Sequence, residues 1–400
     1  MNFQNLIIAD LHIHSRFSRA CSKDLNFETL SKWAKVKGIT LLGTGDFTHP
    51  IWIEEIKKLK SNNKGFYYYK DFPFIITGEI SLIYTQGKGR RIHLVLLIPS
   101  IEVAEKINSY LDTKGRRDYD GRPIFKISCE EFTKEMKNIS QEIEIIPAHI
   151  WTPYFGILGS MSGFDSLKEA FGKQEKNIFA IETGISSDPK MNLQINELKN
   201  KSIVSFSDSH SFWPWRLGRE ATIFNKTDSY SELIKQIREN SFIGTIEVDP
   251  AYGKYHWDGH ANCNFSCSPQ ETKKLNNLCP KCKKELRIGV ENRVEELSNS
   301  KDTNGKMFYT ILPLHEILSL HYKVGMASKK IWAIYNPLIE KFQNEFNILL
   351  NITEDELRKE KIDEKLIDLI LRNRKGKIKV KPGYDGKYGV AQLEEQKKLF

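Results

Sequence analysis

Residues 6–15 read LIIADLHIHS, and this stretch decides the fold of the first part of the chain. The apolar run Leu6–Ala9 is followed at once by two imidazoles, His12 and His14, one residue apart. A short buried strand that ends in such residues is typical of α/β enzymes, which build their active sites where strands end. The segment has no basic start and no small-residue cleavage site, so we expect a first strand and not a signal peptide.

The same pattern recurs along the chain as far as residue 210. Amphipathic stretches such as Phe27–Lys37 and Cys129–Asn138 lie between the apolar runs, and Ser128 with Glu131 forms a capping box before the second. Strands that alternate with helices predict a parallel sheet, and seven such units fit a distorted (βα)7 barrel better than a flat sheet. The further runs are Ile39–Leu42, Phe74–Thr77, His93–Ile98, Ile143–Ile146, Ile178–Ile181 and Ile203–Phe206.

Histidine, aspartate or glutamate residues lie next to every apolar run, and these are the side chains that bind divalent metal ions. A lone histidine at a strand end is more often a structural, hydrogen-bonded residue, but repetition at successive strand ends favours a shared site. Such a cluster can hold two or three Zn, Mn, Fe or Mg ions. His49 and Glu182 are the weakest members, and either can instead orient a ligand or a water. The predicted ligands are His12, His14, Asp46, His49, Glu79, His93, His149, Asp208 and His210.

Four cysteines occur close together at Cys263, Cys267, Cys279 and Cys282. The C-x3-C-x11-C-x2-C spacing predicts one structural Zn²⁺ held by four thiolates. A redox dithiol, an iron–sulfur cluster, or competition from His256 and His260 are the alternatives. The other two cysteines are isolated, and with no export signal we expect a reducing, cytoplasmic setting and association with the nucleoid.

Composition and charge suggest the division of the chain. Forty per cent hydrophobic and 28% charged residues are ordinary for a globular protein, and no apolar run predicts a membrane span. We expect a barrel over 1–250, a connector and four-cysteine zinc-binding domain over 251–300, and a mostly helical basic region over 301–400. The net charge is +9, and Arg372–Lys381 (RNRKGKIKVK) has no acid. This run is either a solvated face or, beside a nuclease-like domain, a surface for nucleic-acid phosphates.

The motifs resemble those of the PHP (polymerase and histidinol phosphatase) superfamily, in the same order. Three further segments make the chain similar to the endonuclease Q family within it: ETGISSDP (182–189), RLGREA (216–221) and YHWDGHANC (255–263). One departure is that many PHP proteins have TDH where this chain has Thr44-Gly45-Asp46. The superfamily motifs are DLHIHS (10–15), GTGDFTHP (43–50), TGEIS (77–81), RIHLV (91–95), PAH (147–149) and SDSH (207–210).

The resemblance implies an endonuclease that cuts DNA on the 5′ side of deaminated bases (hypoxanthine, uracil, xanthine) or abasic sites, leaving a 3′-hydroxyl and a 5′-phosphate. Asp208, His210 and His149 are the catalytic candidates, with Asp208 as a bridging ligand. The alternatives are a histidinol-phosphatase-like enzyme or a non-catalytic DNA-binding protein. Gln392–Phe400 is a candidate dock for a sliding clamp, or simply a frayed end. Candidate DNA contacts are Lys88, Arg90, Arg91, Trp151, Tyr154, Glu182, Arg216 and Arg219.

Overall fold

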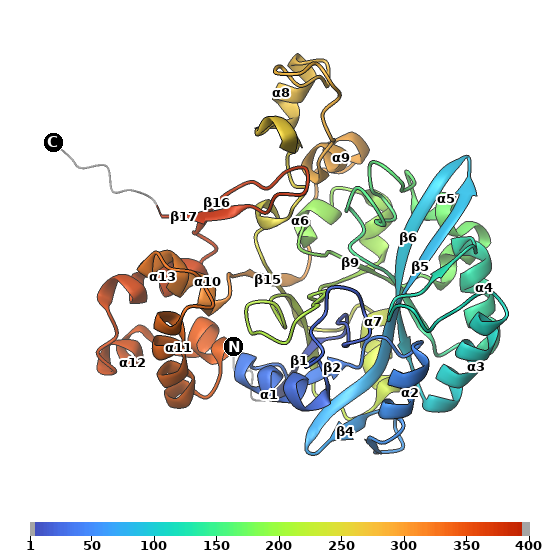
Figure 1. The fold of residues 1–400 in the computed structure, drawn as a ribbon, viewed down its shortest axis with the longest axis horizontal. Coiled ribbons are helices and arrows are strands. Elements are labelled where there is room, and N and C mark those ends of the chain that lie inside the picture. Colours follow the sequence, from blue (N-terminus) through green and yellow to red (C-terminus); the bar gives the residue numbers. More distant parts are fainter. Residues whose placement is uncertain (1–4, 394–400) are drawn as a thin grey trace.

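The computed structural model describes residues 5–393. Figure 1 shows an α/β barrel, a small lobe that carries α8 and α9, and a group of C-terminal helices on the opposite side from the β5–β6 hairpin. The candidate clamp-docking segment Gln392–Phe400 falls mostly outside the described residues, so that expectation stays a prediction. No helix within residues 5–393 is both long and apolar enough to cross a membrane.

Seven strands form the barrel, and each overlaps one of the apolar runs. Hydrogen bonds between strand ends complete the ring. Ile150 N, just after the strand at 144–147, donates to Glu182 O at the end of the strand at 180–182 (3.2 Å). His14 N, just after the strand at 6–10, donates to Ser209 O, which follows the strand at 202–204 (2.9 Å). The fold is therefore a distorted barrel, as predicted. The strands are β1 (Leu6–Asp10), β2 (Leu41–Gly43), β5 (Phe72–Gln86), β6 (Lys88–Ile98), β8 (Glu144–Pro147), β9 (Ala180–Glu182) and β10 (Ser202–Val204).

The prediction of a parallel sheet is wrong for part of this ring. β1, β2 and β5 are parallel neighbours, and so are β9 and β10, but β6 is antiparallel to both β5 and β8. β5 and β6 form one long hairpin that turns at Gly87, whose φ is 71°. A tight turn of this kind needs no crossover helix, so the strand reverses direction. Glu79 and His93 consequently lie in the middle of this hairpin and not at strand ends.

Further strands extend the barrel sheet on both sides. β11 (Ala221–Asn225) pairs with β1 in antiparallel fashion, and β12 (Gly244–Glu247) pairs with β11. The edges are formed by β3 (Lys60–Ser61), β4 (Tyr67–Tyr69) and β7 (Ile124–Phe125), and by β15 (Met307–Thr310), which runs parallel to β12. Because β15 comes from the C-terminal part of the chain, the barrel sheet includes a strand from beyond the predicted boundary near residue 300.

Helices cover the outside of the barrel and bury its apolar side chains. Most begin at a capping side chain; Asn26 caps α1 and Ser128 caps α4, as expected at that position. The helices are α1 (Phe27–Lys37), α2 (Pro50–Ile56), α3 (Ile101–Asp112), α4 (Cys129–Ile139), α5 (Leu167–Phe171), α6 (Pro189–Asn192) and α7 (Tyr230–Arg238), with 3-10 turns η2 (Gly172–Asn177), η3 (Asn196–Asn200) and η4 (Pro250–Tyr252).

The small lobe and the C-terminal helices follow the barrel (Figure 1). The lobe, called here the cysteine lobe, spans residues 258–297 and contains β13 (Asp258–His260), η5 (Ala261–Cys263), β14 (Phe265–Cys267), α8 (Pro269–Lys274) and α9 (Val290–Leu297). The C-terminal region contains α10 (Leu314–Tyr322), α11 (Lys329–Phe342), η6 (Asn347–Asn351), α12 (Glu354–Lys359), α13 (Glu364–Arg374), β16 (Lys379–Lys381) and β17 (Val390–Gln392).

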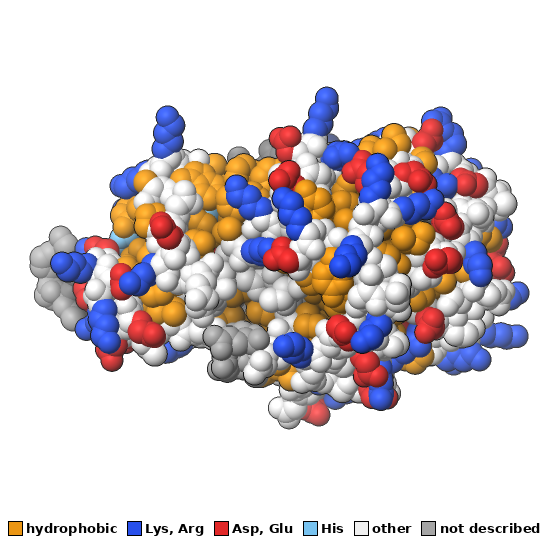
Figure 2. All heavy atoms as spheres, turned by 90° about the horizontal axis from the view of Figure 1, so that it is seen from below, with side chains coloured by type: hydrophobic (Ala, Val, Ile, Leu, Met, Phe, Trp, Pro, Cys, Tyr) orange, Lys and Arg blue, Asp and Glu red, His pale blue; other side chains and the backbone are white. Residues whose placement is uncertain are grey.

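The chain after α13 returns to the connector between barrel and lobe. β16 and β17 form an antiparallel hairpin, and Gly383 N donates to Ala251 O (2.8 Å) while Gly389 N donates to Tyr252 O (3.1 Å). On the face in Figure 2, Lys and Arg side chains are interspersed with Asp and Glu. The excess positive charge is thus not gathered into one patch on that face.

A buried ion pair attaches the C-terminal helices to the barrel. Lys37, at the end of α1, donates to Glu345 (2.6 Å) and to the backbone oxygen of Pro214 (2.8 Å). Glu345 also accepts from the Tyr335 hydroxyl (2.8 Å) and from Leu314 N (3.0 Å). Both charged side chains are fully buried, so each needs an opposite charge nearby, and the ion pair provides it.

We expect Lys37→Met to lower the free energy of unfolding by about 3 kcal/mol, because Glu345 would remain buried without a cation. Lys35→Met is the matched control: Lys35 lies on the same helix, but its partner Asp71 is exposed, so the loss should stay below about 1 kcal/mol. Urea unfolding followed by tryptophan fluorescence measures both, since Trp33, Trp213 and Trp332 pack together at this interface. Equal effects of the two substitutions would contradict the expected role of the buried pair.

Candidate metal centre

Two groups of metal-binding side chains meet inside the barrel mouth, and they share Glu79. His12, His14, Glu79 and Asp208 form one group, and Glu79, His93 and His149 form the other; within each group the ligand atoms lie within 4.8 Å of one another. The two carboxylate oxygens of Glu79 face different groups. Glu79 is thus the residue that both groups share, while the expected bridging role of Asp208 stays a prediction.

The distances show how Glu79 divides its oxygens. Oε2 lies 3.5 Å from His12 Nε2 and 3.3 Å from His14 Nε2, while Oε1 lies 2.6 Å from His93 Nδ1 and 3.2 Å from His149 Nε2. Asp208 Oδ1 completes the first group at 3.1 Å from His14 Nε2. A carboxylate that offers one oxygen to each of two sites is suited to hold two cations near one another.

The β5–β6 hairpin explains the contact between Glu79 and His93. In its register His93 pairs with Ser81 and Glu79 pairs with Val95, so Glu79 and His93 are diagonal neighbours on one face. Two residues of the centre, His149 (φ 31°) and Asp208 (φ 47°), have left-handed backbone, and so does the neighbouring Asp46 (φ 46°). Such conformations are costly for residues with a side chain and cluster at functional sites.

Two buried carboxylates lie behind the imidazoles and not in the centre itself. Asp46 accepts from His14 Nδ1 (3.0 Å), and Glu182 accepts from His12 Nδ1 (2.8 Å). Each carboxylate fixes a ring so that its Nε2 faces the centre. This corrects two predictions: Asp46 orients a ligand and does not belong to either ligand group, and Glu182 is too deeply buried to contact a substrate.

Two further predicted ligands lie outside both groups. His49 is the N-cap of α2, where its ring accepts from Ile51 N (3.3 Å) and stacks on Phe17 at 4.1 Å. His210 lies beside the centre, with its ring 4.2 Å from that of His14 and its Nδ1 3.1 Å from the backbone oxygen of Asp208. His49 is therefore corrected to a structural residue, while His210 lies beside the ligand groups and its role as a ligand stays a prediction.

The donor set fits bound cations. His12 Nε2 is buried in the centre and has no hydrogen-bond partner within the described residues, as expected for an atom that ligates a metal ion. Burial lowers the pKa of His12, but the carboxylates of Glu182, Glu79 and Asp208 outweigh it and hold the pKa well above its usual value. Burial also lowers the pKa of His14, but the Asp46 carboxylate outweighs it, so this pKa too is held well above its usual value. The centre thus carries excess negative charge, which protons or metal ions compensate.

The sequence did not reveal Arg122, which also reaches the centre. Its Nη1 donates to Glu79 Oε2 at 2.9 Å. The preceding Asp120-Gly121 reads as an ordinary turn, and the arginine follows no long apolar run. Only the pairing of β7 with β5 brings it here, and that pairing has no signal in the sequence.

A cavity of about 870 Å³ opens above the metal centre. Its wall comes from three parts of the chain: the barrel, the connector (Lys254, Tyr255) and the C-terminal hairpin (Tyr388). Among the candidate DNA contacts, Arg91, Tyr154, Arg216 and Arg219 line it. Of the described residues that form this lining, Asp208 alone is acidic, so the cavity is suited to an anion.

The other candidate contacts do not line the cavity. Lys88 starts β6 at the hairpin turn. Arg90 is buried, where it pairs with Glu169 (3.0 Å) and lies over the Phe164 ring at 3.8 Å. Trp151 is also buried, and its Nε1 donates to Asn192 Oδ1 (2.8 Å). Arg90 and Trp151 are therefore corrected to packing residues.

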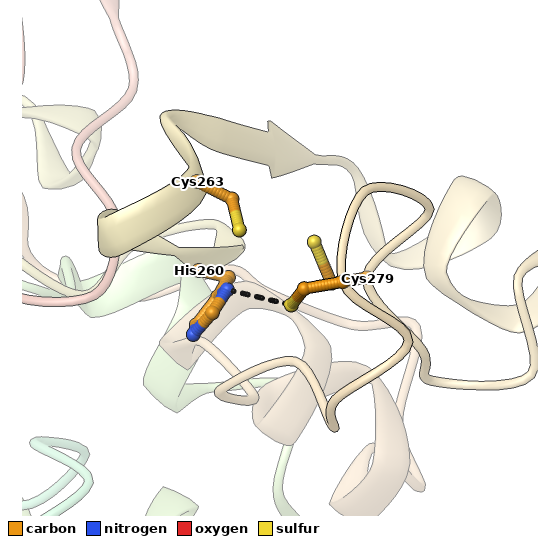
Figure 3. A group of neighbouring side chains, drawn as sticks. His260, Cys263 and Cys279 are labelled. Carbon is orange, nitrogen blue, oxygen red and sulfur yellow. Dashed lines mark hydrogen bonds between the residues drawn. The ribbon is translucent and has the colours of Figure 1, made fainter.

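The cysteine lobe holds a separate ligand group, and its composition differs from the prediction. His260, Cys263, Cys279 and Cys282 have ligand atoms within 4.8 Å of one another. Figure 3 shows the His260 ring and the sulfur atoms of Cys263 and Cys279 pointing toward one another. The set reads H-x2-C and C-x2-C, so both halves have the two-residue spacing of a zinc ribbon.

Cys267 lies outside this group, which corrects its prediction as a ligand. It ends β14, and its buried thiol lies 3.2 Å from the Thr272 hydroxyl. The donors that remain fit Zn²⁺. Burial raises the pKa of Cys279, but the N–H groups of Cys282 and Lys281 outweigh it and lower the pKa to about 6. The thiolate form that a metal requires is therefore favoured at neutral pH.

Comparisons with known proteins show what the chain is similar to. Residues 313–377 match the family described as the MJ0043 C-terminal domain. The chain is 33% identical over 295 residues to the uncharacterized protein MJ0043 of Methanocaldococcus jannaschii, covering 71% of this chain but only 35% of that protein's length. It is 25% identical to the uncharacterized protein YqxK of Bacillus subtilis over 96% of this chain and 98% of that one.

Two solved structures match nearly the whole chain. The lesion-specific endonuclease PfuEndoQ from Pyrococcus furiosus matches with a TM-score of 0.87 and 28% identity, covering 98% of this chain and 96% of that one. Endonuclease Q in complex with a 27-mer duplex that has an abasic lesion at the active site matches with a TM-score of 0.88, 28% identity, and 98% and 97% coverage. The chain is thus close to endonuclease Q, and the predicted class of fold is confirmed: an α/β barrel, a cysteine-rich lobe and a helical C-terminal region.

We expect His260→Ala to lower the zinc content of the protein substantially, and Cys267→Ser to leave it unchanged. The reason is that His260 belongs to the ligand group of the lobe and Cys267 does not. Zinc is measured by mass spectrometry after dialysis against a weak chelator. The opposite ranking of the two variants would restore the four-cysteine prediction.

Metal affinity of the barrel centre should fall as the pH falls from 8 to 6. The neighbouring carboxylates raise the pKa values of His12 and His14, so protons compete for these rings more strongly than for free imidazoles, and an ion must displace them. The loss should approach about tenfold per pH unit for each displaced proton. Calorimetric titration with Mn²⁺ measures it.

Glu182→Gln is the control for this pH dependence. It removes a charge that raises the pKa of His12, so the dependence should become shallower. The affinity at pH 8 should also fall by about 10- to 100-fold, because the ring loses its orienting carboxylate. An affinity that does not change between pH 6 and 8 in the unmodified protein would contradict the expected competition.

Proposed function

We propose that the protein is a metal-dependent DNA endonuclease that hydrolyses the phosphodiester bond 5′ to a deaminated base (hypoxanthine, uracil or xanthine) or an abasic site. The products would carry a 3′-hydroxyl and a 5′-phosphate. One observation carries the proposal: two ligand groups joined by Glu79 lie beneath a cavity walled by arginines. Carboxylate and imidazole ligands suit divalent cations, and the arginines suit phosphates.

Each ligand group would hold one divalent ion, with Glu79 serving both. When bound, such ions activate water at neutral pH and neutralise charge that develops on a phosphoryl group. The chain supplies the arrangement: Asp46 and Glu182 orient His14 and His12, and the left-handed backbone at Asp208 directs its carboxylate inward. A preorganised site of this kind needs little rearrangement during the reaction.

His149 and His210 are the remaining candidates for positioning water or a leaving group. His149 belongs to the second ligand group, and its Nδ1 lies 2.9 Å from the Thr152 hydroxyl, which fixes the ring. Burial and the neighbouring His14 lower the pKa of His210 to about 4, so its ring is neutral at pH 7. A neutral ring at the cavity edge can accept a proton or a hydrogen bond from water.

The relatives support DNA as the substrate class. The Pyrococcus furiosus protein is described as lesion-specific, and the related complex has an abasic lesion at its active site. A damaged base that is recognised inside the cavity must first leave the helix stack, and a damaged base pair resists this less than an intact pair. The cavity offers aromatic walls for such a base in Tyr154, Phe155 and Tyr388.

The two rival functions fit the geometry less well. A small-molecule phosphatase would use the same ligand groups, but it has no evident need for a cavity walled jointly by the barrel, the connector and the C-terminal hairpin. A non-catalytic DNA-binding protein would not need a His12 Nε2 buried without a hydrogen-bond partner among the described residues. Such an atom costs stability unless it binds an ion.

The test is a nicking assay on duplexes that contain inosine, uracil, an abasic site or no lesion, with Mn²⁺ added. We expect nicks 5′ to the lesions and little cleavage of the undamaged duplex. Asp208→Asn should lower the rate at least about a thousandfold while leaving lesion binding largely intact, because a ligand is lost but the arginines remain. The control is Asp118→Asn, which alters an exposed carboxylate paired with Arg116.

Two results would reject the proposal. One is wild-type-like nicking by Asp208→Asn, which would remove Asp208 from the reaction. The other is hydrolysis of p-nitrophenyl phosphate without any nicking of the lesion duplexes, which would favour the phosphatase.

A further inference from the structure

We propose that Arg122 is a catalytic residue that binds the phosphate undergoing hydrolysis, in addition to its contact with Glu79. This inference rests on the proposed function, because it names the group that would receive the anionic substrate. It starts from an unusual juxtaposition: a guanidinium lies within hydrogen-bonding distance of the carboxylate that both ligand groups share.

The sheet register places Arg122 there. β7 runs parallel to β5, with Ile124 opposite Ser81 and Phe125 opposite Leu82. Continuing this register back by two residues places Arg122 opposite Glu79. Ser81 N also donates to Pro123 O (3.1 Å), so the backbone next to Arg122 is tied to β5. The backbone at Arg122 is therefore fixed beside the centre, within reach of Glu79.

The turn before Arg122 is held by residues that lie close in the sequence to Ser18 and Asp46, whose side chains contact the His14 ring. Gly121 N donates to Phe17 O (3.0 Å), and the Thr48 hydroxyl donates to Gly121 O (3.3 Å). A Cβ on Gly121 would lie 2.2 Å from Asp46 Oδ2, so a side chain at this point would displace the carboxylate that contacts His14. The position of the arginine is thus built into the metal centre.

Charge explains why a structural role alone is insufficient. A neutral side chain such as glutamine can also donate to Glu79, and it would not repel the cations that the centre is suited to hold. A third positive group beside two cation sites is better compensated when a further anion joins them. An arginine side chain keeps its charge in proteins, so Arg122 presents a permanent cation to the cavity.

The remaining donors of Arg122 are available on the cavity side. One nitrogen, Nη1, binds Glu79, the side chain is 25% exposed, and Arg122 lines the cavity together with His93, His149 and Asp208. A guanidinium presents its N–H groups as a planar fork that matches phosphate oxygens. Arg122 can therefore hold Glu79 with one nitrogen and donate to a non-bridging phosphate oxygen with another.

The test compares Arg122→Gln and Arg122→Lys with Arg91→Gln, a matched control on the exposed rim of the same cavity. We expect Arg122→Gln to keep its bound metal but to bind inorganic phosphate at least about tenfold more weakly in the Mn²⁺-loaded protein. Its kcat for lesion nicking should fall by about 10²- to 10³-fold, and added guanidinium should restore part of it. Arg91→Gln should raise KM with little change in kcat, as expected for a rim contact.

Arg122→Lys separates charge from geometry. It should keep metal and fold, and recover only part of the phosphate affinity, because an ammonium lacks the fork. The proposal is overturned if Arg122→Gln retains phosphate affinity and kcat within about threefold of the unmodified protein. It is also overturned if both Arg122 variants lose the metal, since Arg122 would then act only by positioning Glu79.

The phosphate titration keeps this inference distinct from the proposed function. If the unmodified protein fails to nick lesion DNA, the proposed function fails, yet weaker phosphate binding by Arg122→Gln would still support an anion-binding role. If nicking succeeds and phosphate binding does not depend on Arg122, only the inference about Arg122 is rejected.

Discussion

The rest of the structure depends on the side chain of Glu79, whose two oxygens belong to two different ligand groups. Four imidazoles, one guanidinium and the neighbouring Asp208 are arranged around this carboxylate. Burial raises the pKa of Glu79, but His93, Arg122 and His12 outweigh it and hold the pKa well below its usual value. A buried anion of this kind is tolerable only among compensating cations, so the barrel must either bind metal ions or retain protons at its histidines.

The sequence predicted the elements of this centre better than their roles. Each apolar run of the barrel is a strand, and His12, His14, Glu79, His93, His149 and Asp208 all converge. It did not separate ligands from the residues behind them, because Asp46 and Asp208 follow their strands in the same way. Asp46 and Asp208 differ in the direction of the backbone and in the imidazole nitrogen that each carboxylate contacts: Asp46 lies at Nδ1 of His14 and Asp208 at Nε2. The spacing of residues in the sequence encodes neither of these two features.

The remaining errors have two physical sources. Arg122 and the contact between Glu79 and His93 depend on strand pairing, and register is fixed by the whole sheet and not by the local pattern. In the cysteine lobe, four cysteines seemed sufficient for a tetrahedral site, but β13 pairs Asp258 with Cys267 and places His260 at the ligand position. The H-x2-C spacing of His260 and Cys263 was present in the sequence as a usable signal.

The cavity wall shows why the barrel alone is not the functional unit. Arg287 of the cysteine lobe donates to the Tyr154 hydroxyl and to Asp385 of the C-terminal hairpin, and Asp385 accepts from Ala261 N (2.7 Å). Tyr154 lines the cavity only a few residues after His149, and Tyr388 lines it from the hairpin. The lobe and the hairpin thus hold the surfaces that would contact a base, while the barrel holds the groups that would contact its phosphate. Under the proposed function, selection of a lesion and cleavage of the bond would thus involve different parts of the chain, joined at the Arg287–Tyr154 contact.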